Sequence, residues 1–288
     1  MLSSSPHPAA DAPPCLIIGC GYLGHRVADL WTTAGRRVLA LTRNRSEELQ
    51  KFGIEPILGD VTDPTTLTVL PAASTVLYAV GLDRTSGKSM SEVYIQGLRN
   101  VLDALPSFER FIYVSSTSVY GQIDGSIVEE SSPTEPFEES GKIVLEAERL
   151  LRDRRPGSII LRFAGIYGPG RLLRKQAILK GEPLMGDPEK WLNLIEVRDG
   201  ARAVLAAEAR ASSGETFIIA DDTPVSRRDF YTHLAKLLNA PVAKFEAGTP
   251  GVPISRDTNR RLTNRKAKAG LGWLPEYGSY RDGLAAAI

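Results

Sequence analysis

The sequence predicts an α/β fold, a doubly wound parallel sheet with a small C-terminal lobe. Continuous apolar runs alternate with segments of helical periodicity along most of the chain, a rhythm typical of parallel strands joined by right-handed helical crossovers. A glycine-rich turn joins the first apolar run to the first helical segment. The chain has 288 residues, 42% of them hydrophobic, enough to bury a core of this kind.

The first element is the apolar run 15–18, followed by Gly19-Cys-Gly-Tyr-Leu-Gly24 and a helix expected at 22–34. Gly-x-Gly-x-x-Gly between a strand and a helix predicts a Rossmann-type dinucleotide-binding turn. Gly19 permits the sharp turn, Gly21 lets the backbone approach a diphosphate, and Gly24 lets helix and strand pack closely. We expect five residues here to bind the cofactor: Gly19, Gly21, Tyr22, Leu23 and Gly24.

The second strand, expected at 37–42, ends in Thr42-Arg-Asn-Arg45. NAD-binding chains usually carry an acidic residue near this point, about 20 residues past the glycines, to bind the ribose 2′-hydroxyl. A guanidinium can instead bind a 2′-phosphate through paired, charge-assisted hydrogen bonds. We therefore expect NADP rather than NAD, bound by Thr42, Arg43 and Asn44. The alternative is that Arg43 and Arg45 are solvated loop charges.

The third and fourth strands are expected at 53–60 and 75–81. Asp60 has two open roles, because its carboxylate could accept a hydrogen bond from an adenine amino group or cap the following turn, where Asp63-Pro64 predicts a helix start. The polar loop from Gly81 to Lys88 could lie over the cofactor. We expect the ends of these strands to contribute Asp60, Val61, Ala79, Val80 and Gly81 to the cofactor site.

A helix expected at 92–105 precedes a fifth strand at 111–114, which leads into a serine-rich string. Four strings accompany the glycine turn: Gly59-Asp-Val61, Tyr113-Val-Ser-Ser-Thr-Ser-Val-Tyr-Gly121, Leu161-Arg-Phe-Ala-Gly-Ile-Tyr-Gly-Pro-Gly170 and Asn193-Leu-Ile-Glu-Val-Arg-Asp199. Together they resemble the extended short-chain dehydrogenase/reductase superfamily, of the NAD-dependent epimerase/dehydratase type, over nearly the whole chain after residue 14. The glycine spacing departs from the Gly-x-x-Gly-x-x-Gly of typical extended members and indicates an atypical branch.

The resemblance implies a catalytic serine after the fifth strand, and a tyrosine with a lysine four residues later on the next helix. Ser116 matches the serine. The family's Tyr-Gly-Lys-Ser-Lys-Leu-x-x-Glu aligns with Ser140-Gly-Lys-Ile-Val-Leu-Glu-Ala-Glu148, which puts Ser140 at the tyrosine and Val144 at the lysine. Neither residue can take over proton transfer near neutral pH. Positioned acid–base catalysis contributes about 10²–10⁴-fold, so hydride transfer should be slow unless another group acts.

Ser116, Tyr120 and Lys142 remain the candidates for catalysis. Glu138 and Lys142 stand four residues apart on a helix expected at 138–153, so the two side chains could face each other, although such a pair also stabilises a helix start. Lys142 could instead bind a ribose hydroxyl or phosphate of the cofactor. Tyr120 could reach a substrate from its loop or serve only in packing.

The C-terminal lobe is expected to border the substrate. After a sixth strand at 157–163, the loop 165–170 lies where ligands of open α/β sheets bind, and we expect Ser116, Tyr167 and Arg171 to contact a small-molecule substrate. Helices are expected at 171–180, 197–211 and 227–238, and a late strand at 216–220. In the basic run 260–268, Arg260 or Arg261 could meet a phosphate or lie on a solvated helix face.

The domain expectation is a flexible tail at 1–14, a dinucleotide-binding domain at 15–165 completed by parts of 193–221, and a smaller lobe made mainly of 166–288. Lys plus Arg number 35 and Asp plus Glu number 34, a net charge of +1 that favours neither nucleic acid nor a membrane as partner. The two cysteines fit a reducing cytoplasm, and the three histidines form no metal-binding pattern. An apolar stripe on 138–153 could face the sheet or a second subunit, which leaves a homodimer open.

Two functions remain in view. The first is an NADP-dependent oxidoreductase or epimerase/dehydratase-like enzyme, acting on a nucleotide sugar or a similar carbonyl or alcohol substrate, as the resemblance implies. The second is a non-catalytic protein that binds NADP(H) and reports its redox state.

Overall fold

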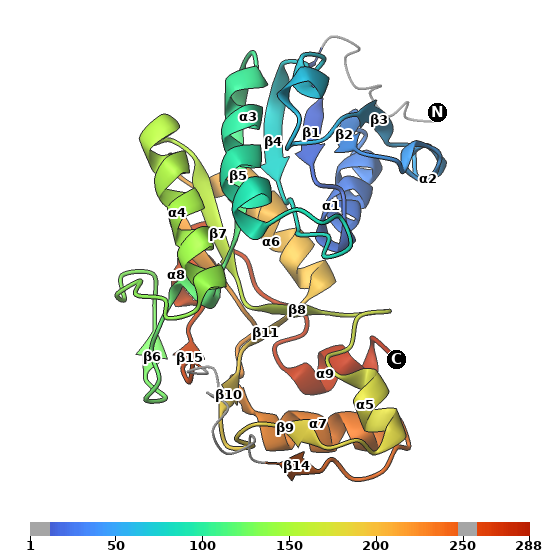
Figure 1. Ribbon diagram of the computed structural model, residues 1–288, viewed down its shortest axis with the longest axis vertical. Helices are drawn as coiled ribbons and strands as arrows, with labels where there is room; N and C mark the ends of the chain where they lie inside the picture. Colours follow the sequence, from blue (N-terminus) through green and yellow to red (C-terminus); the bar gives the residue numbers. More distant parts are fainter. Residues whose placement is uncertain (1–11, 247–257) are drawn as a thin grey trace, which may run out of the picture. The chain divides into compact units, whose positions relative to one another are not determined.

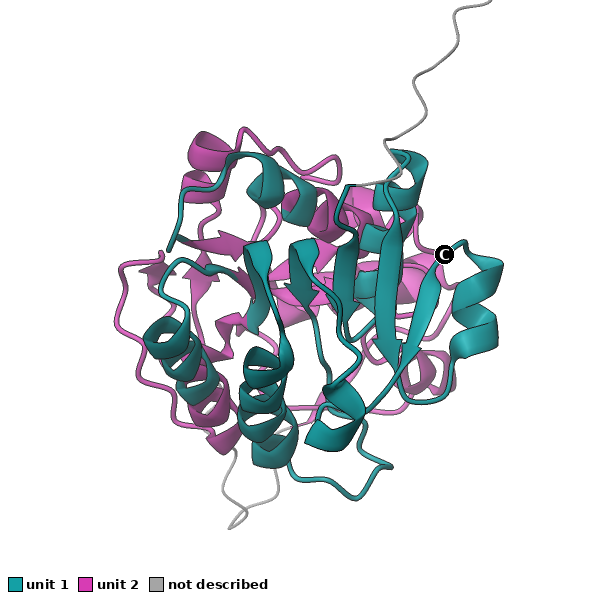
Figure 2. Cartoon of the chain, turned by 90° about the horizontal axis from the view of Figure 1, so that it is seen from above, with its two compact units in different colours: residues 1–115, 146–160, 204–215 teal, residues 116–145, 161–203, 216–288 magenta. Residues whose placement is uncertain are grey.

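The computed structural model describes residues 12–246 and 258–288. The chain forms two compact units, each assembled from three segments (Figure 2). Unit 1 comprises residues 1–115, 146–160 and 204–215, and unit 2 comprises residues 116–145, 161–203 and 216–288. Most of the expected N-terminal tail lies outside the described residues. The last residue of that segment, Pro14, is buried, and its carbonyl accepts a hydrogen bond from the Ser74 backbone N–H at 2.9 Å.

The main sheet has seven strands in the order β12-β7-β5-β4-β1-β2-β3. Strands β1 to β5 and β7 are labelled in Figure 1. The strands are β1 (Cys15–Ile18), β2 (Val38–Thr42), β3 (Glu55–Leu58), β4 (Ala73–Tyr78), β5 (Phe108–Ser116), β7 (Ile159–Phe163) and β12 (Thr216–Ile219). Parallel pairing joins β1 to both β2 and β4, and continues to β3 on one side and β5 on the other. The strand order reverses between β1 and β4, which confirms the doubly wound prediction and marks where ligands bind in such sheets.

Helical segments connect these strands. They are α1 (Tyr22–Thr33), α2 (Ser46–Lys51), the 3₁₀ turn η1 (Pro64–Leu67), the π-helical turn η2 (Glu92–Gln96), α3 (Gly97–Ala104), the 3₁₀ turn η3 (Thr117–Val119), α4 (Glu139–Arg154) and α6 (Val197–Arg210). The helix expected at 92–105 therefore starts as a π-helical turn and becomes α-helical at Gly97. A Cβ at Gly97 would lie 2.8 Å from Cγ2 of Val61, so glycine lets this helix approach the loop after β3 closely.

A largely buried carboxylate joins three parts of unit 1. Glu208 of α6 accepts hydrogen bonds from Trp31 Nε1 at 2.8 Å, from Arg36 Nη1 at 2.6 Å and from Thr75 Oγ1 at 2.5 Å. The Glu208 side chain is 13% exposed, so these contacts satisfy a charge that water barely reaches. The carboxylate thereby ties the helix after β1 and the start of β4 to α6.

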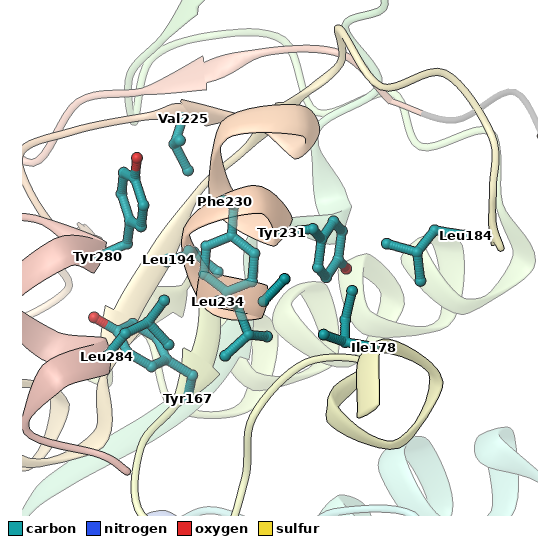
Figure 3. Packing of buried hydrophobic residues seen from close by; sticks show 11 residues of the cluster. Tyr167, Ile178, Leu184, Leu194, Val225, Phe230, Tyr231, Leu234, Tyr280 and Leu284 are labelled. Atoms are coloured by element: carbon teal, nitrogen blue, oxygen red, sulfur yellow. The ribbon is translucent and has the colours of Figure 1, made fainter. Parts of the chain in front are cut away.

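Unit 2 combines short strand pairs with small helices. Its remaining elements are β6 (Ile127–Val128), β8 (Gly165–Tyr167), α5 (Lys175–Lys180), β9 (Leu184–Met185), β10 (Trp191–Leu192), β11 (Leu194–Glu196), β13 (Val225–Ser226), α7 (Arg227–Leu237), β14 (Phe245–Glu246), β15 (Arg261–Leu262), α8 (Arg265–Leu271) and α9 (Tyr280–Ala285). Its core gathers residues of α7, α9 and β8, including Phe230, Leu234, Leu284 and Tyr167, all 0% exposed (Figure 3). Ser226 caps α7 by accepting a hydrogen bond from the Asp229 N–H at 3.0 Å, as expected for a helix that starts after residue 226.

Candidate functional site

A pocket of about 490 Å³ in unit 1 lies at the carboxyl ends of β1, β2, β3 and β4. Its lining contains ten of the residues expected to bind the cofactor: Gly19, Gly21, Thr42, Arg43, Asn44, Asp60, Val61, Ala79, Val80 and Gly81. The structure thus brings together four strand ends that are far apart in the sequence. Tyr22, Leu23 and Gly24 start α1 and do not line this pocket.

The three glycines of the turn differ in their surroundings. Gly19 has a φ of +92°, and a Cβ there would lie 2.7 Å from the Ala79 carbonyl oxygen and from Val80. A Cβ at Gly24 would lie 2.9 Å from the Gly19 carbonyl oxygen. A Cβ at Gly21 would meet no atom within 4 Å. Gly19 and Gly24 are therefore required by the turn itself, whereas Gly21 leaves space open for a bound group.

Charged residues surround the end of β2 in this pocket. Arg43 Nη2 donates to Asp83 Oδ2 at 2.7 Å, and Arg45 Nη2 donates to the Cys20 carbonyl oxygen at 2.8 Å. Hydrogen bonds from Thr85 and from Arg43 lower the pKa of Asp83 to about 2, so this carboxylate is ionised at neutral pH. The sequence pointed to the loop after Gly81 but gave no sign that Asp83 would pair with Arg43, because residues 40 positions apart meet only in the folded sheet.

Asp60 is engaged in its own turn. Its Oδ1 accepts hydrogen bonds from the Thr62 backbone N–H at 2.8 Å and from the Thr62 hydroxyl at 2.9 Å. Of the two roles left open by the sequence, the structure shows turn capping, while Asp60 also lines the pocket.

A second pocket, of about 310 Å³, lies within unit 2. Its lining includes Ser116, Ser118, Ser140, Asn193 and Arg260. Ser116 Oγ accepts a hydrogen bond from the Ser118 backbone N–H at 3.1 Å. The pocket therefore unites the serine matched to the family motif with Ser140, the residue aligned to the family's tyrosine. Ser140 and Asn193 were not among the expected contacts.

The other expected site residues lie elsewhere. Tyr120 is fully buried, and its hydroxyl accepts a hydrogen bond from Arg162 Nη1 at 2.8 Å. Tyr167 is fully buried against Gly283, and burial raises its pKa. Lys142 is exposed and pairs with Glu139 at 3.6 Å, not with Glu138 as the spacing suggested. Arg171 is exposed and exchanges backbone hydrogen bonds with Gly168. None of these four residues lines either pocket.

The described residues show neither a reactive cysteine nor a cluster of metal ligands. Cys15 and Cys20 are free and buried, and burial raises the pKa of each thiol to about 12, which keeps both unreactive at neutral pH. The described parts of the chain contain no group of three or more His, Cys, Asp or Glu residues placed to hold a metal ion. In the same residues, no helix has both the length and the hydropathy needed to cross a bilayer.

The sheet order and the glycine-lined pocket define a Rossmann-type, dinucleotide-binding class of fold. Residues 15–220 match the NAD dependent epimerase/dehydratase family, and the chain belongs to it. Protein YeeZ of Escherichia coli (strain K12) is 30% identical over 241 residues, covering 80% of this chain and 85% of YeeZ.

Solved structures that are similar to this chain are consistent with its assignment to this family. A Methylobacillus flagellatus structure assigned to the NAD-dependent epimerases/dehydratases has a TM-score of 0.77 and 31% identity, and covers 96% of this chain and 98% of that one. UDP-glucose 4-epimerase of Thermotoga maritima, solved with UDP-glucose, has a TM-score of 0.79 at 20% identity, and covers 95% of this chain and 97% of that one. At that identity the likeness concerns the fold alone.

Proposed function

We propose that the unit 1 pocket binds NADP(H) and that the chain is an atypical oxidoreductase or epimerase/dehydratase-like enzyme. The observation that carries the cofactor choice is the end of β2, where Thr42, Arg43 and Asn44 line the pocket in place of the acidic residue typical of NAD sites. The guanidinium of Arg43 would bind the 2′-phosphate, and the turn at Gly21 would receive the diphosphate. When bound, the nicotinamide ring would supply or accept a hydride.

Calorimetry is expected to show NADPH binding about tenfold or more tightly than NADH, because a charge-assisted pair to the extra phosphate contributes about 1.5–3 kcal/mol. Arg43→Ala should remove most of this difference. Arg37→Ala is the matched control, since Arg37 pairs with Glu55 at 2.6 Å and does not line the pocket. Equal NADPH and NADH affinities in the unmodified protein would contradict the proposal.

A second variant, Asp83→Asn, tests the contact between Arg43 and the 2′-phosphate by the same calorimetric comparison of NADPH with NADH. The Asp83 carboxylate holds Arg43 and would compete with a 2′-phosphate for that guanidinium. Its removal should therefore strengthen NADPH binding severalfold and leave NADH binding nearly unchanged. A parallel gain for both cofactors would indicate a general charge effect instead.

For the chemical step, Ser116 is the residue best placed to act on a substrate. Its Oγ accepts from the Ser118 N–H, and in the described chain its own proton has no acceptor, so the hydroxyl can donate to a substrate oxygen. Ser140 and the buried Val144 replace the family's proton-transfer pair. Turnover should accordingly be slow and should depend on Ser116.

The replacement of that pair also favours a second candidate, a redox sensor that binds NADP(H) without turnover. Steady-state assays with NADPH over a panel of ketones and nucleotide sugars separate the two. Turnover that Ser116→Ala abolishes supports the enzyme, whereas tight NADPH binding with no turnover on any substrate supports the sensor.

A further inference from the structure

Arg260 is a buried cation whose hydrogen-bonding capacity is only partly used. It is 8% exposed and lines the unit 2 pocket. Its Nη2 donates to the Thr117 carbonyl oxygen at 2.7 Å. Its Nε and Nη1 are buried and have no hydrogen-bond partner among residues 12–246 and 258–288.

The backbone around Arg260 is fixed on both sides. β15 pairs in parallel with β6, and the Arg261 N–H donates to the Ser126 carbonyl oxygen at 2.9 Å. Asn193 clamps the segment, because its Nδ2 donates to the Arg260 carbonyl oxygen at 2.9 Å and its Oδ1 accepts from the Leu262 N–H at 2.7 Å. The guanidinium is therefore held in the pocket by a pre-formed frame.

Holding the Arg260 guanidinium buried and charged costs free energy. Burial lowers the pKa of Arg260 to about 10, which still leaves the side chain charged at neutral pH. A buried charge with two unsatisfied donors is strongly disfavoured unless something compensates it. The acidic residue of the pocket lining, Glu138, is exposed and forms no ion pair with Arg260 in the described structure.

Guanidinium chemistry indicates what would compensate this charge. The N–H groups of a guanidinium form planar forks, Nε with Nη2 or Nη1 with Nη2, that match the two oxygens of a carboxylate or phosphoryl group. Nη2 of Arg260 carries a second N–H besides the one it donates to Thr117, so either fork can be completed with one of the unused atoms Nε and Nη1. Ser116, Ser118 and Ser140 line the same pocket, and serine hydroxyls can donate to an anion as well. A pocket of about 310 Å³ has room for an oxyanion group and a small part of the molecule that carries it.

We propose that the unit 2 pocket binds an oxyanion group of the substrate, a carboxylate or phosphoryl group, through the unused N–H groups of Arg260. This inference rests on the proposed function and narrows its substrates to anionic ones. Arg260 then serves as a binding residue that selects the substrate by charge.

The test titrates the full-length protein with inorganic phosphate, pyrophosphate, acetate and citrate, by calorimetry at constant ionic strength and with NADPH present or absent. At least one of these anions should bind the unmodified protein, and Arg260→Gln should weaken that binding by about ten- to a hundredfold. Preference for pyrophosphate over the carboxylates would indicate a phosphoryl-bearing substrate, and the reverse order a carboxylate. Absence of binding by all four anions, or equal binding by Arg260→Gln, would overturn the inference.

Arg261→Gln is the matched control. The Arg261 guanidinium is already used, because its Nε donates to the Gly125 carbonyl oxygen at 2.9 Å and the group lies 5.3 Å from the Trp191 ring centre. This variant should bind the anions as the unmodified protein does. If Arg260→Gln does not fold, the side-chain Nε–H signal of Arg260 in ¹H–¹⁵N spectra of the unmodified protein gives the answer: it should shift during the anion titration, and a constant signal would overturn the inference.

NADPH binding is measured in the same samples. Intact NADPH binding with no anion binding would refute the anion site alone. If the unmodified protein does not bind NADPH, the proposed function is refuted, whether or not the anions bind.

Discussion

Gly21→Ala is expected to weaken NADPH binding by about a hundredfold without lowering stability, because a methyl group there would occupy the space that a diphosphate needs. Gly21 has a φ of −92°, and a Cβ would meet no protein atom within 4 Å. Alanine therefore fits the free protein. Calorimetry with NADPH and urea unfolding of the same variant measure the two effects separately.

Gly19→Ala, in contrast to Gly21→Ala, is expected to lower the stability of the protein. With a φ of +92° and backbone atoms of Ala79 and Val80 at 2.7 Å from its Cβ, alanine at this position should destabilise unit 1 by about 3 kcal/mol or more. The pair of variants separates the glycine that the turn requires from the glycine that the cofactor requires. Unchanged NADPH affinity in Gly21→Ala would show that the diphosphate does not lie against this turn.

Glu208→Leu is expected to lower the free energy of unfolding by about 2–4 kcal/mol. The change leaves the Arg36 guanidinium, the Trp31 indole N–H and the Thr75 hydroxyl without their shared acceptor. Arg36 is 34% exposed, so water partly compensates its charge, and the expected loss is smaller than for a fully buried pair.

Urea unfolding measures this loss. Glu55→Gln is the matched control, since Glu55 is 51% exposed and pairs with Arg37 on the surface, where such a pair contributes about 0–1 kcal/mol. A loss below 1 kcal/mol in Glu208→Leu would show that the carboxylate does not hold the three elements together.

The first unit could be predicted well from sequence because its signals are local. Continuous apolar runs marked β1, β2 and β4, and the glycine spacing marked the turn that opens the pocket. The residues that follow these strands could then be predicted to share one site, because parallel strands place their carboxyl ends at one edge of the sheet. The π-helical turn Glu92–Gln96 was missed because its apolar spacing also fits an ordinary α-helix.

The second unit was harder to predict because distant segments build it. The helix expected from residue 171 starts only at Lys175, since Arg174 adopts a left-handed φ of 55° and precedes the first helical turn. Arg260 could not be placed from its basic neighbours. The helix α8 begins only at Arg265, and Arg260, which directly precedes β15, is buried and does not lie on a solvated helix face. Side-chain pairs such as Arg43 with Asp83 could not be predicted either, because no periodic sequence pattern indicates them.

The pairing of β6 (Ile127–Val128) with β15 (Arg261–Leu262) also has a consequence for biosynthesis. A ribosome releases the serines at 116, 118 and 140 long before it releases Arg260 and its neighbours. A nascent chain can therefore finish the glycine turn early, but the wall of the unit 2 pocket closes only near the end of translation. The lining of that pocket is therefore completed only after most of the chain has been synthesised, and a chain cut short before residue 258 lacks two of its lining residues, Thr258 and Arg260.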